Sequence, residues 1–152
     1  MYERLNPFSS SPGAMQELIS LQEYLHTAGF DAGMMGLVRT RVSQINGCAH
    51  GIGLHTRRAL TFGESEERLF MLDAWRHASC YSERERAALA WTEAVTLISQ
   101  SYVPDSVFDL VRQLFTEEEL VTLTLIVAAT NAWNRVEISF RGLPVSKHEV
   151  RS

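Results

Sequence analysis

The 152-residue sequence predicts an all-α protein, and three observations favour this class. Apolar residues recur at three- and four-residue intervals along most of the chain, which is the periodicity of an amphipathic helix. Two Ser/Thr-x-x-Glu capping boxes, from Ser82 to Glu85 and from Thr116 to Glu119, mark the starts of two long helices. No segment alternates polar and apolar residues over the length of a strand. We therefore expect about six to seven helices in a single domain, residues 1–152.

Start and stop signals place the individual elements. Residues 1–13 contain Pro7, Pro12 and a serine triplet, and predict an extended N-terminal arm. The helices expected after this arm cover about residues 14–28, 32–45, 48–61, 65–75, 83–99, 105–114 and 117–140. Gly142 and Pro144 are expected to end the last helix.

The net charge and the hydropathy of the chain argue against two classes of binding partner, nucleic acids and membranes. A net charge of −4 with interleaved signs gives no basic surface, which argues against a nucleic-acid partner. No run approaches the roughly 20 apolar residues of a membrane span, so no membrane partner is expected. The N-terminus lacks the features of a secretory signal, and two cysteines make no disulfide framework, so we expect a soluble cytoplasmic protein. Residues 120–129 are apolar nearly all round and predict a homo-oligomer, whether dimer, trimer or hexamer.

The chemistry is expected in the segment RVSQINGCAHGIGLHT, residues 41–56. Cys48 falls in the first turn of a predicted helix, where free backbone N–H groups and the helix dipole stabilise a thiolate. His55 follows seven residues later on the same helix face, about 10 Å along the axis and too far for direct contact. His50 places a second imidazole between them.

RVSQINGC together with His55 resembles the active-site motif of the alkylhydroperoxidase D-like (AhpD-like), or carboxymuconolactone decarboxylase, family. RERAALAWTEAVT, LDAWR and NAWNR resemble later signatures of the family, so the likeness covers roughly residues 5–142. The family pattern is a glutamate, eleven residues, then Cys-x-x-Cys-x-x-x-His. The resemblance implies an all-helical, oligomer-forming domain that reduces hydroperoxides with its cysteine pair, the glutamate and histidine acting as a proton relay.

The chain departs from the family motif at two of four positions, because Gly51 replaces the second cysteine and Gly36 replaces the relay glutamate. Cys48 and His55 therefore remain as the candidate catalytic residues. Without a second thiol three residues away, no Cys-x-x-Cys disulfide can form, and we expect Gly51 to leave space that enlarges a pocket. No cofactor is expected, and no metal, because Cys48, His50 and His55 do not share one helix face.

Three hypotheses for function remain open. The first is a one-cysteine thiol peroxidase that uses an external thiol reductant, with activity that is weak or absent. The second is a non-catalytic ligand-binding or oligomeric scaffold. The third is a carboxymuconolactone decarboxylase-like lyase with His55 as acid or base. Elsewhere, Glu93 in an apolar helix predicts an interior ion pair with Arg76 or Arg135, and Cys80 predicts a structural role.

Overall fold

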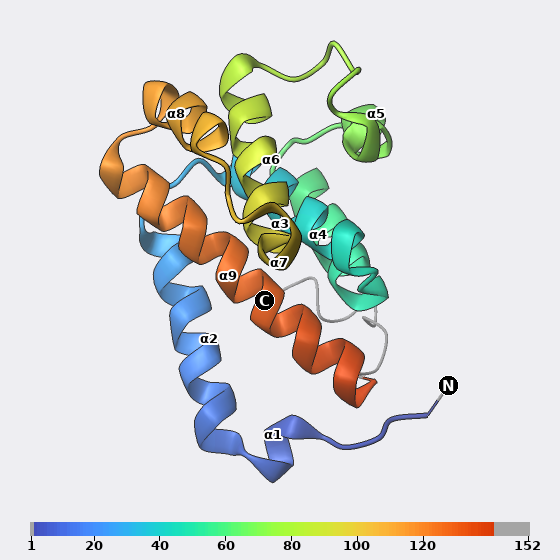
Figure 1. Cartoon of the computed structure of the whole chain (residues 1–152). Coiled ribbons are helices and arrows are strands. Elements are labelled where there is room, and N and C mark those ends of the chain that lie inside the picture. The colour runs from blue at the N-terminus through green and yellow to red at the C-terminus, as the bar shows by residue number, and fades with distance from the viewer. Residues whose placement is uncertain (1, 142–152) are drawn as a thin grey trace.

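The computed structural model describes residues 2–141, which form nine α-helices and one 3-10 helix with no strand among them (Figure 1). The all-α prediction is confirmed. The elements are α1 (Pro7–Ser10), α2 (Pro12–Thr27), α3 (Ala32–Asn46), α4 (Ala49–Thr61), α5 (Glu66–Met71), η1 (Leu72–Ala74), α6 (Glu83–Thr96), α7 (Ile98–Ser101), α8 (Asp105–Leu114) and α9 (Glu117–Phe140). The expected stop signals Gly142 and Pro144 lie outside the described residues.

The structure differs from the expected elements mainly at their ends. The expected extended arm instead contains the helical turn α1, and α2 already begins at Pro12. Pro7 occupies the start of α1, where its fixed φ suits a helix, and the Asn6 side chain accepts backbone N–H bonds there. The helix expected over residues 83–99 is interrupted at Leu97, which separates α6 from α7.

Helix α3 is the central element of the fold, since it packs against α4, α6 and α9 and contributes to both apolar clusters of the core. The larger cluster joins α3 to α6, α8 and α9 through side chains such as Val38, Val111 and Ile126. The smaller one joins α3 to α4, α5 and η1 around Leu37 and Leu72. Burial of each such aliphatic side chain contributes roughly 1.5–3 kcal/mol to the stability of the fold. The two clusters therefore fix the position of the α3–α4 junction from both sides.

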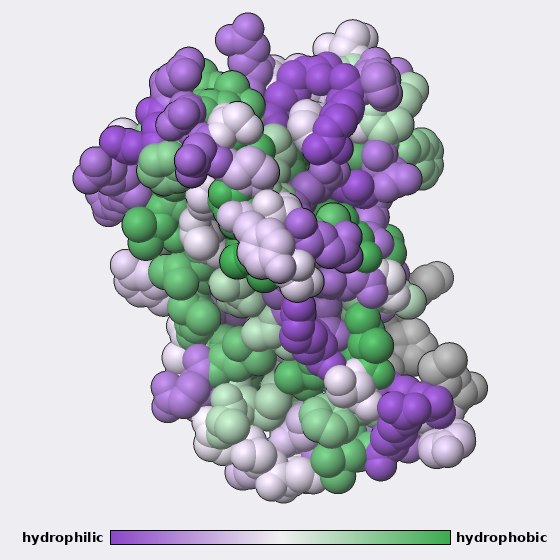
Figure 2. Space-filling view, viewed as in Figure 1, coloured by the Kyte–Doolittle hydropathy of each residue, from purple (hydrophilic) through white to green (hydrophobic). Residues whose placement is uncertain are grey.

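Apolar side chains also gather on the surface over α9 and α2, as the face in Figure 2 shows. Val121 and Leu125 of α9 are 60% and 39% exposed, although their neighbours Leu123 and Ile126 are fully buried. One helix therefore supplies the core on one side and leaves an apolar stripe on the other. None of the helices between residues 2 and 141 is long and apolar enough to cross a membrane.

Candidate functional site

Cys48 lies at the sharp junction between α3 and α4. Gly47 ends α3 in the left-handed conformation, with φ of 66°, which glycine adopts without strain. Cys48 then takes an extended conformation as the N-cap of α4, and its Sγ accepts a hydrogen bond from the Gly51 backbone N–H at 3.3 Å. The residue is only 2% exposed. The expected position of the thiol at a helix start is confirmed.

Burial, however, raises the pKa of the Cys48 thiol above its ordinary value. The backbone N–H groups of Gly51 and His50 lower that pKa, and the nearby carboxylate of Glu137 raises it further. The unfavourable effects are larger, so the thiolate expected from the helix start is not the resting form. At neutral pH Cys48 is a protonated thiol, and its reactivity depends on a neighbouring proton acceptor.

His50 and Glu137 form a pair near this helix start, and the Glu137 carboxylate is an electrostatic neighbour of the thiol. His50 extends from the first turn of α4, Glu137 comes from the last turns of α9, and His50 Nδ1 is 3.8 Å from Glu137 Oε2. Both side chains are mostly buried. The arrangement places a cysteine, a histidine and a carboxylate at one point of the fold. Sequence reasoning missed Glu137, whose only signal was an acidic residue late in a largely apolar helix.

His55 lies two turns further along α4, and His50 is among its electrostatic neighbours. His55 is 7% exposed, and its electrostatic neighbours also include Arg39 and Arg58. Burial, followed by the charges of these two arginines, lowers its pKa to about 3. The imidazole is therefore neutral at physiological pH and takes up a proton only in strong acid. This environment argues against the role of proton acceptor that the motif implied for His55.

Space at Gly51 is occupied by neighbouring side chains. A Cβ at this position would lie 2.4 Å from Ser43 Oγ and 3.2 Å from Asn134 Oδ1. Ser43 and Asn134 are both buried and are joined by a 3.0 Å hydrogen bond. The prediction that Gly51 leaves an enlarged pocket is therefore wrong, because α3 and α9 close over it. Gly36 is similarly confined, since a Cβ there would come within 3.1 Å of Ala59 Cβ.

The Glu93 side chain of α6 contacts α3 and the segment that follows η1. Its carboxylate accepts bonds from Arg41, at 3.0 Å, and from the Trp75 indole, at 2.8 Å, and forms an ion pair with Arg76 at 2.5 Å. Burial alone raises the pKa of Glu93, but these donors outweigh it and the pKa is lowered. The expected pair with Arg76 is confirmed, whereas Arg135 bonds the backbone of its own helix. Arg41 of the motif thus holds α3 against α6.

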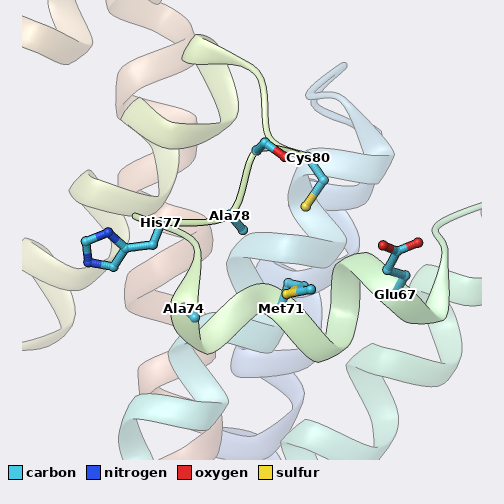
Figure 3. Close-up of a pocket in the computed structure, with 7 residues that line it drawn as sticks. Glu67, Met71, Ala74, His77, Ala78 and Cys80 are labelled. Atoms are coloured by element: carbon cyan, nitrogen blue, oxygen red, sulfur yellow. The ribbon is translucent and has the colours of Figure 1, made fainter.

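Cys80 lines a separate pocket of about 320 Å³ in the loop that follows η1 (Figure 3). Its sulfur points toward Met71, Glu67 lies at the far side, and the His77 ring points away from both (Figure 3). Both cysteines are free thiols. This pocket shares no residue with the surroundings of Cys48.

Within residues 2–141, no three His, Cys, Asp or Glu side chains come together as metal ligands. What the fold does assemble is a helical domain with a buried cysteine capping a helix beside a histidine–carboxylate pair. Comparison with known proteins identifies the family to which this architecture belongs. Residues 12–94 match the sequence profile of the carboxymuconolactone decarboxylase family, and the chain belongs to that family.

Individual relatives agree with this assignment. The uncharacterized protein YdfG of Bacillus subtilis (strain 168) is 36% identical over 147 residues, covering 97% of this chain and all of YdfG. A protein of unknown function from Agrobacterium tumefaciens, described as a candidate antioxidant defence protein AhpD, has a crystal structure that superimposes with a TM-score of 0.92, 34% identity and coverage of 96% and 100% of the two chains. The debrominase Bmp8 shares the fold, with a TM-score of 0.82 at 17% identity over 91% of this chain and 75% of its own. The predicted membership of the AhpD-like, or carboxymuconolactone decarboxylase, family is confirmed.

Proposed function

We propose that this protein reduces hydroperoxides through Cys48 alone, with an external thiol as the reductant. One observation supports the proposal: His50, two residues after Cys48, pairs with Glu137, and the Glu137 carboxylate is an electrostatic neighbour of the buried thiol. Glu137 of α9 supplies a carboxylate to a motif whose own glutamate position is Gly36. The similarity to the Agrobacterium protein described as a candidate AhpD supports the same class of reaction.

The chemistry follows from the protonated resting thiol. His50, oriented by Glu137, accepts the Cys48 proton as the sulfur attacks the terminal oxygen of the hydroperoxide. The O–O bond breaks, the proton returns to the leaving alkoxide or hydroxide, and Cys48 becomes a sulfenic acid. One external thiol displaces water to form a mixed disulfide, and a second releases Cys48. The sum is one hydroperoxide and two thiols converted to one alcohol, one water and one disulfide.

Burial of Cys48 limits the substrate. Because the residue is 2% exposed, a bulky organic hydroperoxide cannot approach the sulfur without opening the α3–α4 junction. Small peroxides need less displacement, so hydrogen peroxide is the expected best substrate. We also propose a cytoplasmic location, where low-molecular-weight thiols are abundant and Cys48 stays reduced.

The decisive experiment compares two cysteine variants in a coupled peroxide assay with dithiothreitol as reductant. We expect wild-type protein and Cys80→Ser to consume hydrogen peroxide at the same rate, and Cys48→Ser to show only the uncatalysed rate. Equal rates in all three proteins would refute the proposal. Loss of activity in Cys80→Ser alone would assign the reaction to the other thiol and refute it equally.

A second candidate, a non-catalytic ligand-binding scaffold, is favoured by the raised pKa of Cys48 and by the closed packing at Gly51. Both features reduce thiol reactivity, and neither is needed for binding. This candidate predicts no peroxide turnover above background in wild-type protein, and unchanged stability in Cys48→Ser. The same assay therefore separates the two functions.

We further propose a homo-oligomer assembled through the apolar stripe of α9. Val121 and Leu125 are exposed one helical turn apart on α9. Large apolar side chains are rarely exposed to solvent on a helix whose other apolar residues are buried in the core. Val121→Glu should shift the mass measured by light scattering toward the monomer, whereas Thr122→Glu, its less exposed polar neighbour, is the matched control. A monomeric wild-type protein would refute this proposal.

A further inference from the structure

The N-terminal segment, residues 2–10, is attached to the last turns of α9. The Arg4 backbone N–H donates to the Phe140 carbonyl at 2.9 Å. Four residues later along the segment, the Phe8 ring stacks on Trp133 with 6.2 Å between the ring centroids. Figure 1 shows this segment at the same end of the molecule as the end of α9. The two contacts lie about two helical turns apart on α9, so the N-terminal segment spans that stretch of the helix.

The His50–Glu137 pair lies within the same stretch of α9. Glu137 follows Trp133 by four residues and precedes Phe140 by three, so these three positions share one face of the helix. From α4, His50 Nδ1 approaches to 3.8 Å from Glu137 Oε2. The N-terminal segment is therefore bound on both sides of the turn that carries Glu137, and it borders the pair.

Only surface contacts attach the N-terminal segment. Among residues 2–10 none is buried, and only Pro7 is partly covered. Segments with few buried contacts detach at a small fraction of the free energy of global unfolding. The attached state also leaves the Trp133 indole Nε1 buried with no acceptor among residues 2–141. Detachment of Phe8 exposes that indole N–H to water, which offsets part of the lost contact.

We propose that the N-terminal segment is a strap that restricts access to the His50–Glu137 pair and admits water and reagents when it detaches. For peroxide chemistry this inference rests on the proposed function, because access to the pair matters there only if His50 accepts the thiol proton. The strap itself is measured by chemical modification of His50, which requires no turnover. A strap that opens in a protein without peroxide turnover would therefore refute the proposed function alone.

The test is the rate at which diethyl pyrocarbonate modifies His50, followed by peptide mass spectrometry at neutral pH. His77, which is exposed in the turn after η1, is the internal reference in every sample. Arg4→Ala removes the side-chain bond to the Ser139 carbonyl, at 3.2 Å, together with a positive charge at the C-terminus of α9. Phe8→Ala removes the ring contact. Each variant should raise the His50 rate relative to the His77 rate by about threefold to tenfold.

Two control variants separate opening of the strap from other effects. Ser9→Ala changes an exposed neighbour in α1 and should modify at the wild-type rate. Arg84→Ala breaks the ion pair with Glu119 at the opposite end of α9. That variant should lower the free energy of unfolding without raising the rate at His50, because the N-terminal segment keeps its contacts.

The two possible results are distinct. Faster modification of His50 in Arg4→Ala and in Phe8→Ala, with the His77 rate unchanged, would support the strap. The inference is overturned if both variants modify His50 at the wild-type rate, or if Arg84→Ala accelerates the reaction equally, since the histidine would then react through global unfolding. It is also overturned if wild-type His50 already reacts as fast as His77, because the attached segment would then restrict nothing.

Discussion

Replacing Gly51 with alanine adds one methyl group at a position where the structure has no room for it. The new Cβ would lie 2.4 Å from Ser43 Oγ and 3.0 Å from Ser43 Cβ. Ser43 is fully buried and hydrogen-bonded to Asn134, so it cannot yield without breaking that bond. Gly53, half a turn further along α4, is the matched control, because its Cβ would meet only the end of the flexible Arg57 side chain at 3.4 Å.

The expected free energies follow from three contributions. Alanine improves helix propensity over glycine by at most about 1 kcal/mol at either position. At Gly51 the forced methyl group costs about 1–3 kcal/mol, and loss of the buried Ser43–Asn134 bond costs a further 1–3 kcal/mol or so. Gly51→Ala should therefore lower the free energy of unfolding by about 3 kcal/mol. Gly53→Ala should raise it slightly.

Urea unfolding followed by far-ultraviolet circular dichroism measures both values. A Ser43→Ala background removes the closest contact and should reduce the penalty of Gly51→Ala, so the double variant should be more stable than additivity predicts. The reasoning is refuted if Gly51→Ala is as stable as Gly53→Ala. The same packing predicts that Gly51→Cys does not by itself restore a working Cys-x-x-Cys pair.

Three more outcomes are expected. Lowering the pH from 6.5 toward 5 should destabilise wild-type protein more steeply than His55→Gln in urea unfolding, by up to about 1.4 kcal/mol per pH unit. Glu93→Gln should lower the free energy of unfolding by about 2 kcal/mol, because the partly buried donors around it lose their charged acceptor. His50→Gln should slow alkylation of Cys48 by iodoacetamide at pH 7 and leave the free energy of unfolding nearly unchanged.

The sign of the pH effect follows from the lowered pKa of His55. The unfolded chain takes up a proton near pH 6.5, whereas the folded protein takes one up only near pH 3. The contribution is therefore complete above pH 6.5 and is lost progressively as the pH falls through this range. Equal pH dependence in wild type and His55→Gln would contradict the buried environment described for this residue.

An unchanged alkylation rate in His50→Gln would likewise contradict its role as proton acceptor.

Most of the fold could be predicted from local signals in the sequence. Capping boxes, glycine stops and apolar periodicity are encoded within a few residues, and they located all seven expected helices. The turn at Pro7 was missed because proline and serine are as common in loops as at helix starts. The break at Leu97 was missed because no glycine or proline marks it.

The site could be predicted only as far as it is local. The position of Cys48 as a helix cap follows from its own neighbours in the chain. Glu137, by contrast, reaches His50 only because α9 crosses α4, and Ser43 fills the space at Gly51 only because α3 and α9 close there. The low pKa of His55 likewise comes from arginines that tertiary packing brings near. Contacts between distant segments of the chain have no fixed residue interval, so a single sequence does not reveal them.

The central claim is that Cys48 is the thiol that reacts with peroxide. Trapping with dimedone after a brief exposure to hydrogen peroxide, followed by peptide mass spectrometry, tests it directly, because dimedone marks sulfenic acids. We predict an adduct on Cys48 in wild-type protein and in Cys80→Ser, formed more slowly in His50→Gln. An adduct confined to Cys80, or none on Cys48 while the protein consumes peroxide, would contradict the account.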